Sequence, residues 1–379
     1  MNVTTGFRFL RVVPSVARNR FPFRTAVAFA LCSIACSSDN PTQTVAPGFL
    51  GGTSNDHEVG LVVNSTGKAV TLFQLGAPAT QKTIALGASS TITPTGLSVS
   101  GRRAAVPLGN AASVALIDLE TQTATRFFTF ASGNATGSAF VDDTTIIAAN
   151  PTLNIVGRFT TGQTGDAITT LSAKIASQPT AVAISGSRAL IVSSNLDNNF
   201  LPIGNGIVTA VDTKTLQVLG TATTGGTNST DAAIGPDGNL YVLNTGDYVG
   251  SASITIINPT TMAVVSTVPD VGVGAGAISI DASGLAYISN FISGTIVWDT
   301  KSKTFVRSSA NPVCAKISAG CRGAFAATTD AAGDVYQAFF GDTRAGLPPY
   351  IFVFKAGTFA LTDSISVGQG PAAIVIRTF

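Results

Sequence analysis

A four-strand pattern that recurs from residue 58 to the end of the chain constrains the fold more than any other feature. Its clearest copies read DAAIGPDGNLYVLN at 231–244 and AISIDASGLAYISN at 277–290, and two further apolar stretches follow each copy, within 254–268 and 295–308. Copies begin near residues 59, 93, 136, 179, 229, 275 and 322. Seven units of about 46 residues therefore fill the chain from residue 58 onward, and a regular repeat of this length indicates one structural unit per copy.

Repeated four-stranded units of this length predict an all-β fold, a seven-bladed β-propeller of four-stranded antiparallel blades. One blade cannot cover both of its apolar faces, so we expect the blades to pack in a ring and to form the core between them. The low content of charged residues, 11%, agrees with this prediction, because surface helices need charged faces. The final segment, PAAIVIRTF at 371–379, resembles a first strand with no blade after it. We expect it to pair with the strands near residues 59–86, which closes the ring and removes two sheet edges.

Turn chemistry supports the same arrangement. In Pro236-Asp237-Gly238, Pro fixes φ, Asp bonds its own backbone and Gly accepts a positive φ, as a tight turn requires. Asp or Asn also recurs between the third and fourth strands, where its side chain can accept hydrogen bonds from turn amides. These residues, which we interpret as structural, are Asp118, Asp212, Asn258 and Asp299.

The second strands of two copies carry a family resemblance. LYVLN at 240–244 and AYISN at 286–290, each followed by turns that contain Asp or Asn, resemble the YVTN-type β-propeller repeats of bacterial cell-surface and periplasmic proteins. The similarity is clearest over residues 180–310. It implies a seven-bladed propeller outside the cytoplasm, and it implies no particular activity.

Residues 1–35 have the pattern of a lipoprotein-type signal peptide. Five arginines and no acidic residue accompany a short apolar run, 26–35, which is about half the roughly 20 residues that a membrane-spanning helix needs. The run ends in LCSIAC, which resembles a bacterial lipobox with Cys36 as the acylated residue, although Ser33 stands where that motif usually has Leu. Ordinary secretory cleavage nearby is the alternative. Residues 36–57, rich in Pro, Gly, Ser and Asn, predict a flexible tether to the propeller domain, 58–379.

Charge and cysteine content fit an extracytoplasmic location. Removal of the five leader arginines leaves 17 basic and 20 acidic residues, so the mature chain has a net charge near −3. No nucleic-acid partner is predicted, and we expect membrane contact only through the lipid anchor. With Cys36 acylated, Cys314 and Cys321 remain in the mature chain and are predicted to form a local disulfide in an oxidising periplasm or at the cell surface.

Three loops are longer than a hairpin needs, at 195–205, 244–253 and 340–349, and in a propeller they emerge on one face. Long loops on a rigid scaffold are the usual place for binding residues. Aromatic side chains beside amides and carboxylates suit a sugar, a peptide or a protein surface. The candidate ligand-binding residues, which include two Asn residues expected nearer the channel mouth, are Asp197, Phe200, Asn244, Asp247, Tyr248, Asn290, Phe340, Asp342 and Arg344.

These features predict a surface-anchored, monomeric binding module for an unidentified protein, peptide or glycan. The alternative is a propeller hydrolase of the lactonase type. Resembling hydrolases use a His or a calcium ion, and the single His of this chain, His57, lies in the predicted tether, so an enzyme is disfavoured and no catalytic residue is assigned. No cofactor is predicted; calcium held by Asp197, Asp247 and Asp342 is the one exception left open, without an assigned metal site.

Overall fold

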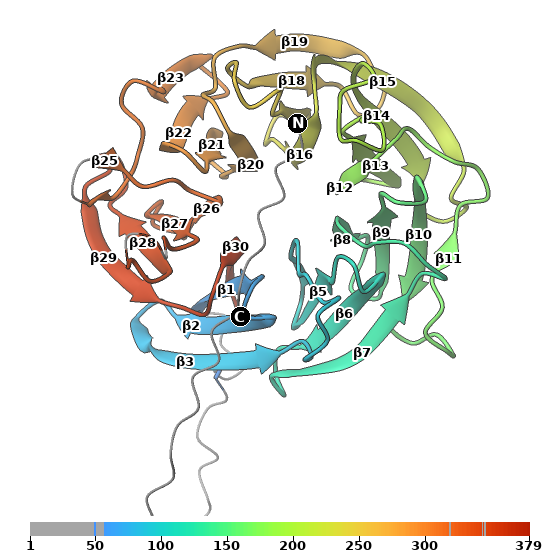
Figure 1. Ribbon diagram of the computed structural model, residues 1–379, viewed down its shortest axis with the longest axis horizontal. Helices are drawn as coiled ribbons and strands as arrows, with labels where there is room; N and C mark the ends of the chain where they lie inside the picture. The colour runs from blue at the N-terminus through green and yellow to red at the C-terminus, as the bar shows by residue number, and fades with distance from the viewer. Residues whose placement is uncertain (1–48, 51–56, 318–319, 343, 345) are drawn as a thin grey trace, which may run out of the picture. The chain divides into compact units, whose positions relative to one another are not determined.

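The computed structural model describes residues 49–50, 57–317, 320–342, 344 and 346–379. Seven four-stranded antiparallel sheets, called blades 1 to 7 here, stand in a ring in this part of the chain (Figure 1). The prediction of an all-β, seven-bladed propeller is confirmed. No helix that could cross a bilayer occurs in the described ranges.

Within each blade the strands follow one another from the axis of the ring outward (Figure 1). In that order, blade 1 contains β30 (Pro371–Thr378), β1 (Glu58–Asn64), β2 (Ala69–Gln74) and β3 (Ala77–Ala85), and blade 2 contains β4 (Ser98–Ser100), β5 (Arg103–Pro107), β6 (Ser113–Asp118) and β7 (Thr123–Thr129). Blade 3 contains β8 (Ser138–Phe140), β9 (Thr145–Asn150), β10 (Ile155–Thr160) and β11 (Thr169–Thr170), and blade 4 contains β12 (Pro179–Ser185), β13 (Arg188–Ser193), β14 (Asn205–Asp212) and β15 (Val218–Thr227). Blade 5 contains β16 (Ser229–Ile234), β17 (Leu240–Asn244), β18 (Ser253–Ile257) and β19 (Val264–Val268), and blade 6 contains β20 (Ala275–Ile280), β21 (Leu285–Asn290), β22 (Gly294–Asp299) and β23 (Thr304–Arg307). Blade 7 contains β26 (Ala326–Thr329), β27 (Val335–Phe339), β28 (Tyr350–Phe354) and β29 (Leu361–Ser366). A small hairpin of β24 (Lys316–Ile317) and β25 (Gly320–Cys321) lies in the connection between blades 6 and 7.

The ring closes through the C-terminal strand, as predicted. Strand β30 pairs antiparallel with β1, from Thr378 opposite Glu58 to Pro371 opposite Asn64. One more backbone bond, from the amide of Phe379 to the carbonyl of His57 (3.0 Å), extends this pairing. Blade 1 therefore contains strands from both ends of the propeller sequence. Because β1 and β30 pair with each other, the two edges along which they meet are not left exposed.

The core lies between the blades. Each of the seven interfaces between neighbouring blades contains a cluster of buried apolar side chains among the described residues. Second and third strands are covered on both faces by the adjacent blades, so sequences such as LYVLN and SITII are apolar nearly throughout instead of alternating. Trp298 packs between blades 5 and 6, where its ring lies 6.3 Å from that of Tyr241. The radial packing inferred from the repeat is confirmed.

The repeated Asp and Asn residues close the turns between third and fourth strands, as predicted. The side chain of Asn258 accepts hydrogen bonds from the amides of Thr260 and Thr261, both at 3.0 Å. The last turn residue, Met262, then has a positive φ of 58°. The same pair of amide bonds forms at Asp118, Asp212 and Asp299. In the first hairpin of blade 5, Gly238 has a φ of +78°, which the predicted tight turn requires.

The antiparallel order gives the ring two different faces. Connections between second and third strands, and those between blades, lie on one side, which we call the loop face. Connections between first and second and between third and fourth strands lie on the other side, the turn face. This division follows because each of the four strands reverses direction, so a blade's fourth strand ends on the side where the next blade begins.

The chain enters the ring at the turn face, where β1 begins at Glu58. Phe49 and Leu50 fall within the segment predicted to be a flexible tether. In the structure both side chains are buried in the cluster between blades 1 and 2, and the carbonyl of Phe49 accepts a hydrogen bond from Gln74 at the end of β2 (2.8 Å). Residues 49–50 are thus attached to the propeller on the side opposite the loop face. The predicted signal peptide and Cys36 lie outside the described residues.

Candidate functional site

The three long loops predicted from the sequence all lie on the loop face, because each joins the second and third strands of its blade. They connect β13 to β14 in blade 4, β17 to β18 in blade 5 and β27 to β28 in blade 7. The connection from β23 to β26, which contains the β24–β25 hairpin, reaches the same face between blades 6 and 7. Neighbouring blades 4 to 7 therefore contribute adjacent loops to one part of this face (Figure 1).

The carboxylates of the first two loops bind the backbone of their own loops. Asp197 accepts hydrogen bonds from two amides, one of them that of Leu201 at 2.9 Å, and this bond is the main reason why the pKa of Asp197 lies below its usual value. Asp247 is held in the same way, and its bond from the amide of Gly250 (2.8 Å) lowers its pKa. Among the described residues, no three His, Cys, Asp or Glu side chains are grouped as metal ligands. Each carboxylate shapes its own loop.

The two candidate Asn residues lie beneath the loops. Asn244, at the end of β17, is 1% exposed; it accepts a hydrogen bond from the hydroxyl of Ser229 (2.6 Å) and donates to those of Ser253 and Thr255. Asn290 ends β21 in the equivalent position and is fully buried. Its side-chain amide donates to the carbonyl of Ile288 (3.1 Å). In this structure neither Asn side chain reaches the solvent.

A row of four aromatic side chains crosses the loop face from blade 5 to blade 7. We call Tyr248, Phe291, Phe325 and Phe340 the aromatic row. Neighbouring ring centroids are 5.9 Å, 6.1 Å and 4.6 Å apart in that order. Tyr248 is 50% exposed, Phe291 38% and Phe325 37%, while Phe340 is half-buried. The four rings come from four different connections and form one continuous, partly exposed surface.

Other exposed apolar side chains lie on the loop face. Val249 and Ile292, each next to a member of the aromatic row, are 83% and 56% exposed. In blade 4, the loop between β13 and β14 presents Phe200, Leu201 and Ile203, all of them more than half exposed. Phe200 is not among the rings of the row. Contiguous exposed apolar surface on a soluble domain usually marks an interaction site.

Two of the exposed aromatic residues occupy a costly backbone conformation. Phe200 has a φ of 62° and Tyr248 a φ of 65°, in the left-handed region where Gly or Asn is normally found. Holding a bulky residue there costs on the order of 1 kcal/mol, and the turn residues Leu216 and Met262 share this conformation, so it is a feature of tight turns in this chain. Both rings are thus kept at the tips of their loops at the expense of local stability.

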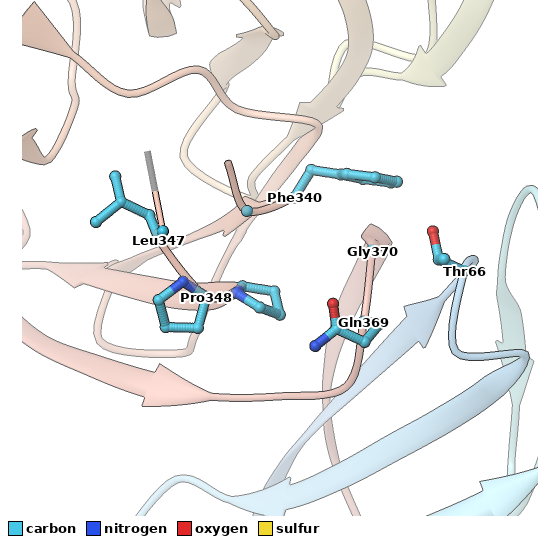
Figure 2. Close-up of a pocket in the computed structure, with 9 residues that line it drawn as sticks. Thr66, Phe340, Leu347, Pro348, Gln369 and Gly370 are labelled. Atoms are coloured by element: carbon cyan, nitrogen blue, oxygen red, sulfur yellow. The ribbon is translucent and has the colours of Figure 1, made fainter. Parts of the chain in front are cut away.

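The aromatic row ends at a pocket of about 600 Å³ between blade 7 and blade 1 (Figure 2). The loop between β27 and β28 supplies one wall, and the β29–β30 connection and the β1–β2 turn supply the other. A methyl group on Gly370, which has a φ of +69°, would lie 2.5 Å from the hydroxyl of Thr66 and 2.8 Å from the ring of Phe340, so these parts approach closely only because residue 370 is Gly. The lining, without a charged side chain, is Thr66, Phe340, Gly341, Gly346, Leu347, Pro348, Pro349, Gln369 and Gly370.

The predicted disulfide supports this wall of the pocket. Cys314 and Cys321 are bonded across the β24–β25 hairpin, with their Cα atoms 5.3 Å apart. The next residue, Arg322, lies 3.7 Å from the carboxylate of Asp342 in the β27–β28 loop. Asp342 also accepts a bond from the amide of Arg344 (3.0 Å), whose side chain is exposed. Asp342 and Arg344 therefore lie beside the pocket, and an ion pair ties their loop to the disulfide-bonded hairpin.

A titratable group that the sequence analysis did not single out lies on the innermost strand β16. Asp231 accepts hydrogen bonds from its neighbour Ala232 and, across to blade 6, from the amide of Ile278 (both 2.9 Å). Burial raises the pKa of Asp231 to about 6, against the lowering effect of these two bonds. The carboxylate thus links the innermost strands of blades 5 and 6. Keeping it ionised near neutral pH costs free energy because the group is buried.

Of the predicted residues, Tyr248 and Phe340 join the aromatic row, and Asp342 and Arg344 lie beside its pocket. Sequence reasoning missed Phe291 and Phe325, because both stand outside the three long loops. One signal for Phe291 is available in the repeat: it directly follows the Asn that ends the second strand, and so begins a connection on the loop face.

No family model matches this chain, and no curated protein matches it in sequence. Among solved structures, it is similar to the hydrazine synthase of Kuenenia stuttgartiensis, with a TM-score of 0.58 and 14% sequence identity over 76% of this chain and 90% of that one. At this level of identity, the similarity shows the propeller fold alone.

Proposed function

We propose that this chain is a bacterial extracytoplasmic lipoprotein with a YVTN-type β-propeller, which binds a macromolecule of the periplasm or cell surface through its loop face. The observation that supports the proposal most strongly is the aromatic row with its adjoining pocket. Aromatic side chains dominate the energetics of recognition surfaces, and four of them stay partly exposed here although each costs hydration free energy.

The attachment of the N-terminal segment suits this function. Phe49 and Leu50 are held near the turn face, so a lipid at Cys36 would be connected to the side of the ring opposite the aromatic row. The 13 residues from Ser37 to Phe49 span at most about 45 Å when fully extended. Such a tether leaves the loop face free to meet a partner away from the membrane. The disulfide Cys314–Cys321 agrees with an oxidising compartment.

Two measurements test the proposal. Mass spectrometry of the mature chain isolated from bacterial membranes is expected to show a lipid-modified Cys36, and the Cys36→Ser variant is expected to leave the membrane fraction. An unmodified mature N-terminus would reject the anchor.

Retention of the Cys36→Ser chain on isolated bacterial envelopes tests the loop face. Tyr248→Asp with Phe325→Asp is expected to abolish retention, because a carboxylate would replace each ring. Phe305→Asp is the matched control, since Phe305 is 38% exposed but lies on the outer strand β23. Equal retention of both variants would place the binding surface elsewhere.

The calcium-dependent hydrolase alternative receives no comparable support. Its acidic ligands would have to converge on one ion, whereas Asp197 and Asp247 accept hydrogen bonds from the amides of their own separate loops.

A further inference from the structure

The aromatic row has a geometry that suits a chain-like ligand. Its ring planes are inclined to each other by 45°, 39° and 31° in sequence along the row. At a centroid distance of 4.6 Å, Phe325 and Phe340 partly overlap, whereas the wider spacings to Phe291 and Tyr248 spread the row across the loop face. Tyr248 and Phe291 come from loops of blades 5 and 6, and Phe325 and Phe340 from blade 7, so one extended ligand could contact three blades.

The pocket at the end of the row offers polar groups that suit a neutral ligand. Thr66 and Gln369 are exposed and supply a hydroxyl and a side-chain amide, which together donate and accept hydrogen bonds. Figure 2 shows these two residues on the side of β30 and β1, with Phe340, Leu347 and Pro348 around the rest of the hollow. Apolar rings beside a few polar groups are the usual composition of a small-molecule or oligomer site.

The charge of the site disfavours polyanionic ligands. The nine residues that line the pocket carry no ionisable side chain, and Arg344 beside it is a single exposed cation. A nucleic acid needs Arg or Lys at several phosphates. A peptide added as a β-strand needs an exposed sheet edge, but the strands only end at the loop face, so their edges are not presented there.

A neutral sugar chain matches both the aromatic rings and the uncharged polar groups. The faces of a pyranose ring expose C–H groups that pack on aromatic rings, while its hydroxyl groups project at the edge and bond to amides and hydroxyls without any charge. We propose that the aromatic row and its pocket bind a neutral polysaccharide chain, with sugar rings packed on the exposed parts of the aromatic row and one sugar held by Gln369 and Thr66. This inference rests on the proposed function and specifies its partner.

Affinity electrophoresis in native gels tests the inference. The gels contain hydroxyethyl cellulose, laminarin, soluble starch, galactomannan or glycol chitin, and the protein is the full Cys36→Ser chain. The wild-type surface is expected to be retarded by at least one polysaccharide. Tyr248→Ala and Phe325→Ala are each expected to weaken binding about 2- to 10-fold, the value of one aromatic contact. Phe305→Ala is the matched control and is expected to bind like the parent chain.

The pocket and the fold have their own controls. Gln369→Ala is expected to weaken binding to the same polysaccharide. The thermal midpoints of this variant and of the two ring variants are expected to stay near that of the parent chain, because each replaced side chain is exposed. Absence of retardation in all five gels, or equal retardation of the Tyr248, Phe325 and Phe305 variants, would overturn the inference. Binding of a proline-rich peptide instead of every polysaccharide would also overturn it, because such peptides use aromatic grooves too.

The outcomes separate this inference from the proposed function. If no polysaccharide binds but envelope retention still depends on Tyr248 and Phe325, the loop face binds another partner and only the sugar assignment fails. If envelope retention is also independent of both residues, the binding function at this face fails with it.

Discussion

Closure of the ring by β30 is expected to stabilise the whole propeller, and truncating two of its side chains measures this contribution. Ile374 and Ile376 are 6% and 9% exposed and pack in the cluster between blades 7 and 1. Replacing a buried Ile by Ala costs about 2–5 kcal/mol. Because the two residues share one cluster, their effects do not simply add, and we expect Ile374→Ala with Ile376→Ala to cost about 4–8 kcal/mol. That is a large fraction of the roughly 5–15 kcal/mol by which a typical domain is stable.

Chemical unfolding followed by the fluorescence of Trp298 shows whether the loss of stability extends to blades that do not contain the replaced residues. Trp298, the single Trp of the chain, lies between blades 5 and 6, two blade interfaces away from the replaced residues. If the ring unfolds as one unit, its fluorescence transition moves to lower denaturant together with the far-ultraviolet circular dichroism. Leu361→Ala on the outer strand β29 is the control, because Leu361 is 49% exposed and its loss is expected to cost about 0.5 kcal/mol or less. A Trp298 transition that does not move in the double variant would refute the cooperative closure.

Three further predictions concern single groups. Because burial raises the pKa of Asp231 from 3.8 to about 6, ionised Asp231 destabilises the fold increasingly from pH 4 to pH 6 and by a constant amount above that. Between pH 4 and pH 7, the unfolding free energy of Asp231→Asn is therefore expected to rise by up to about 3 kcal/mol relative to that of wild type in urea unfolding, and a pH-independent difference would contradict the shift. Asn258→Ala loses two amide bonds and is expected to cost about 1–2 kcal/mol, whereas Asn258→Asp, which keeps the acceptor, is expected to stay near wild type in the same assay. Millimolar calcium is expected to leave the thermal midpoint unchanged relative to chelator, since Asp197 and Asp247 bind their own loops; a rise of several degrees would reveal a calcium site.

Much of the fold could be predicted because the same pattern of apolar strands and turn residues recurs in several copies along the chain. Each copy places apolar strands between turns with Asp, Asn or Gly, and the segment 371–379 has the composition of a first strand without a blade of its own. The closure, the Asx turns, the Cys314–Cys321 disulfide and the inter-blade position of Trp298 all follow from such local signals. The structure confirms all four predictions. The turn and strand signals recur from blade to blade because neighbouring blades impose the same environment on each copy.

The candidate site was less predictable because it depends on contacts between copies. Phe291 and Phe325 meet only where blades 6 and 7 lie side by side, and neither belongs to a long loop. For Asn244 and Asn290, position at the end of a strand suggested access to the channel mouth, yet the side chains turn inward to bond the backbone and hydroxyls beneath the loops. Local sequence does not determine which side a strand-end residue faces; the packing of the next connection does.

Hydroxyl-radical footprinting with mass spectrometry tests most directly whether the loop face is the recognition surface. Aromatic side chains react readily, and the Cys36→Ser chain can be compared free and bound to isolated bacterial envelopes. We predict that oxidation of Tyr248, Phe291 and Phe325 falls on binding, while that of Phe305 on the outer strand β23 does not change. Protection of Phe305 with undiminished oxidation of the aromatic row would contradict the account.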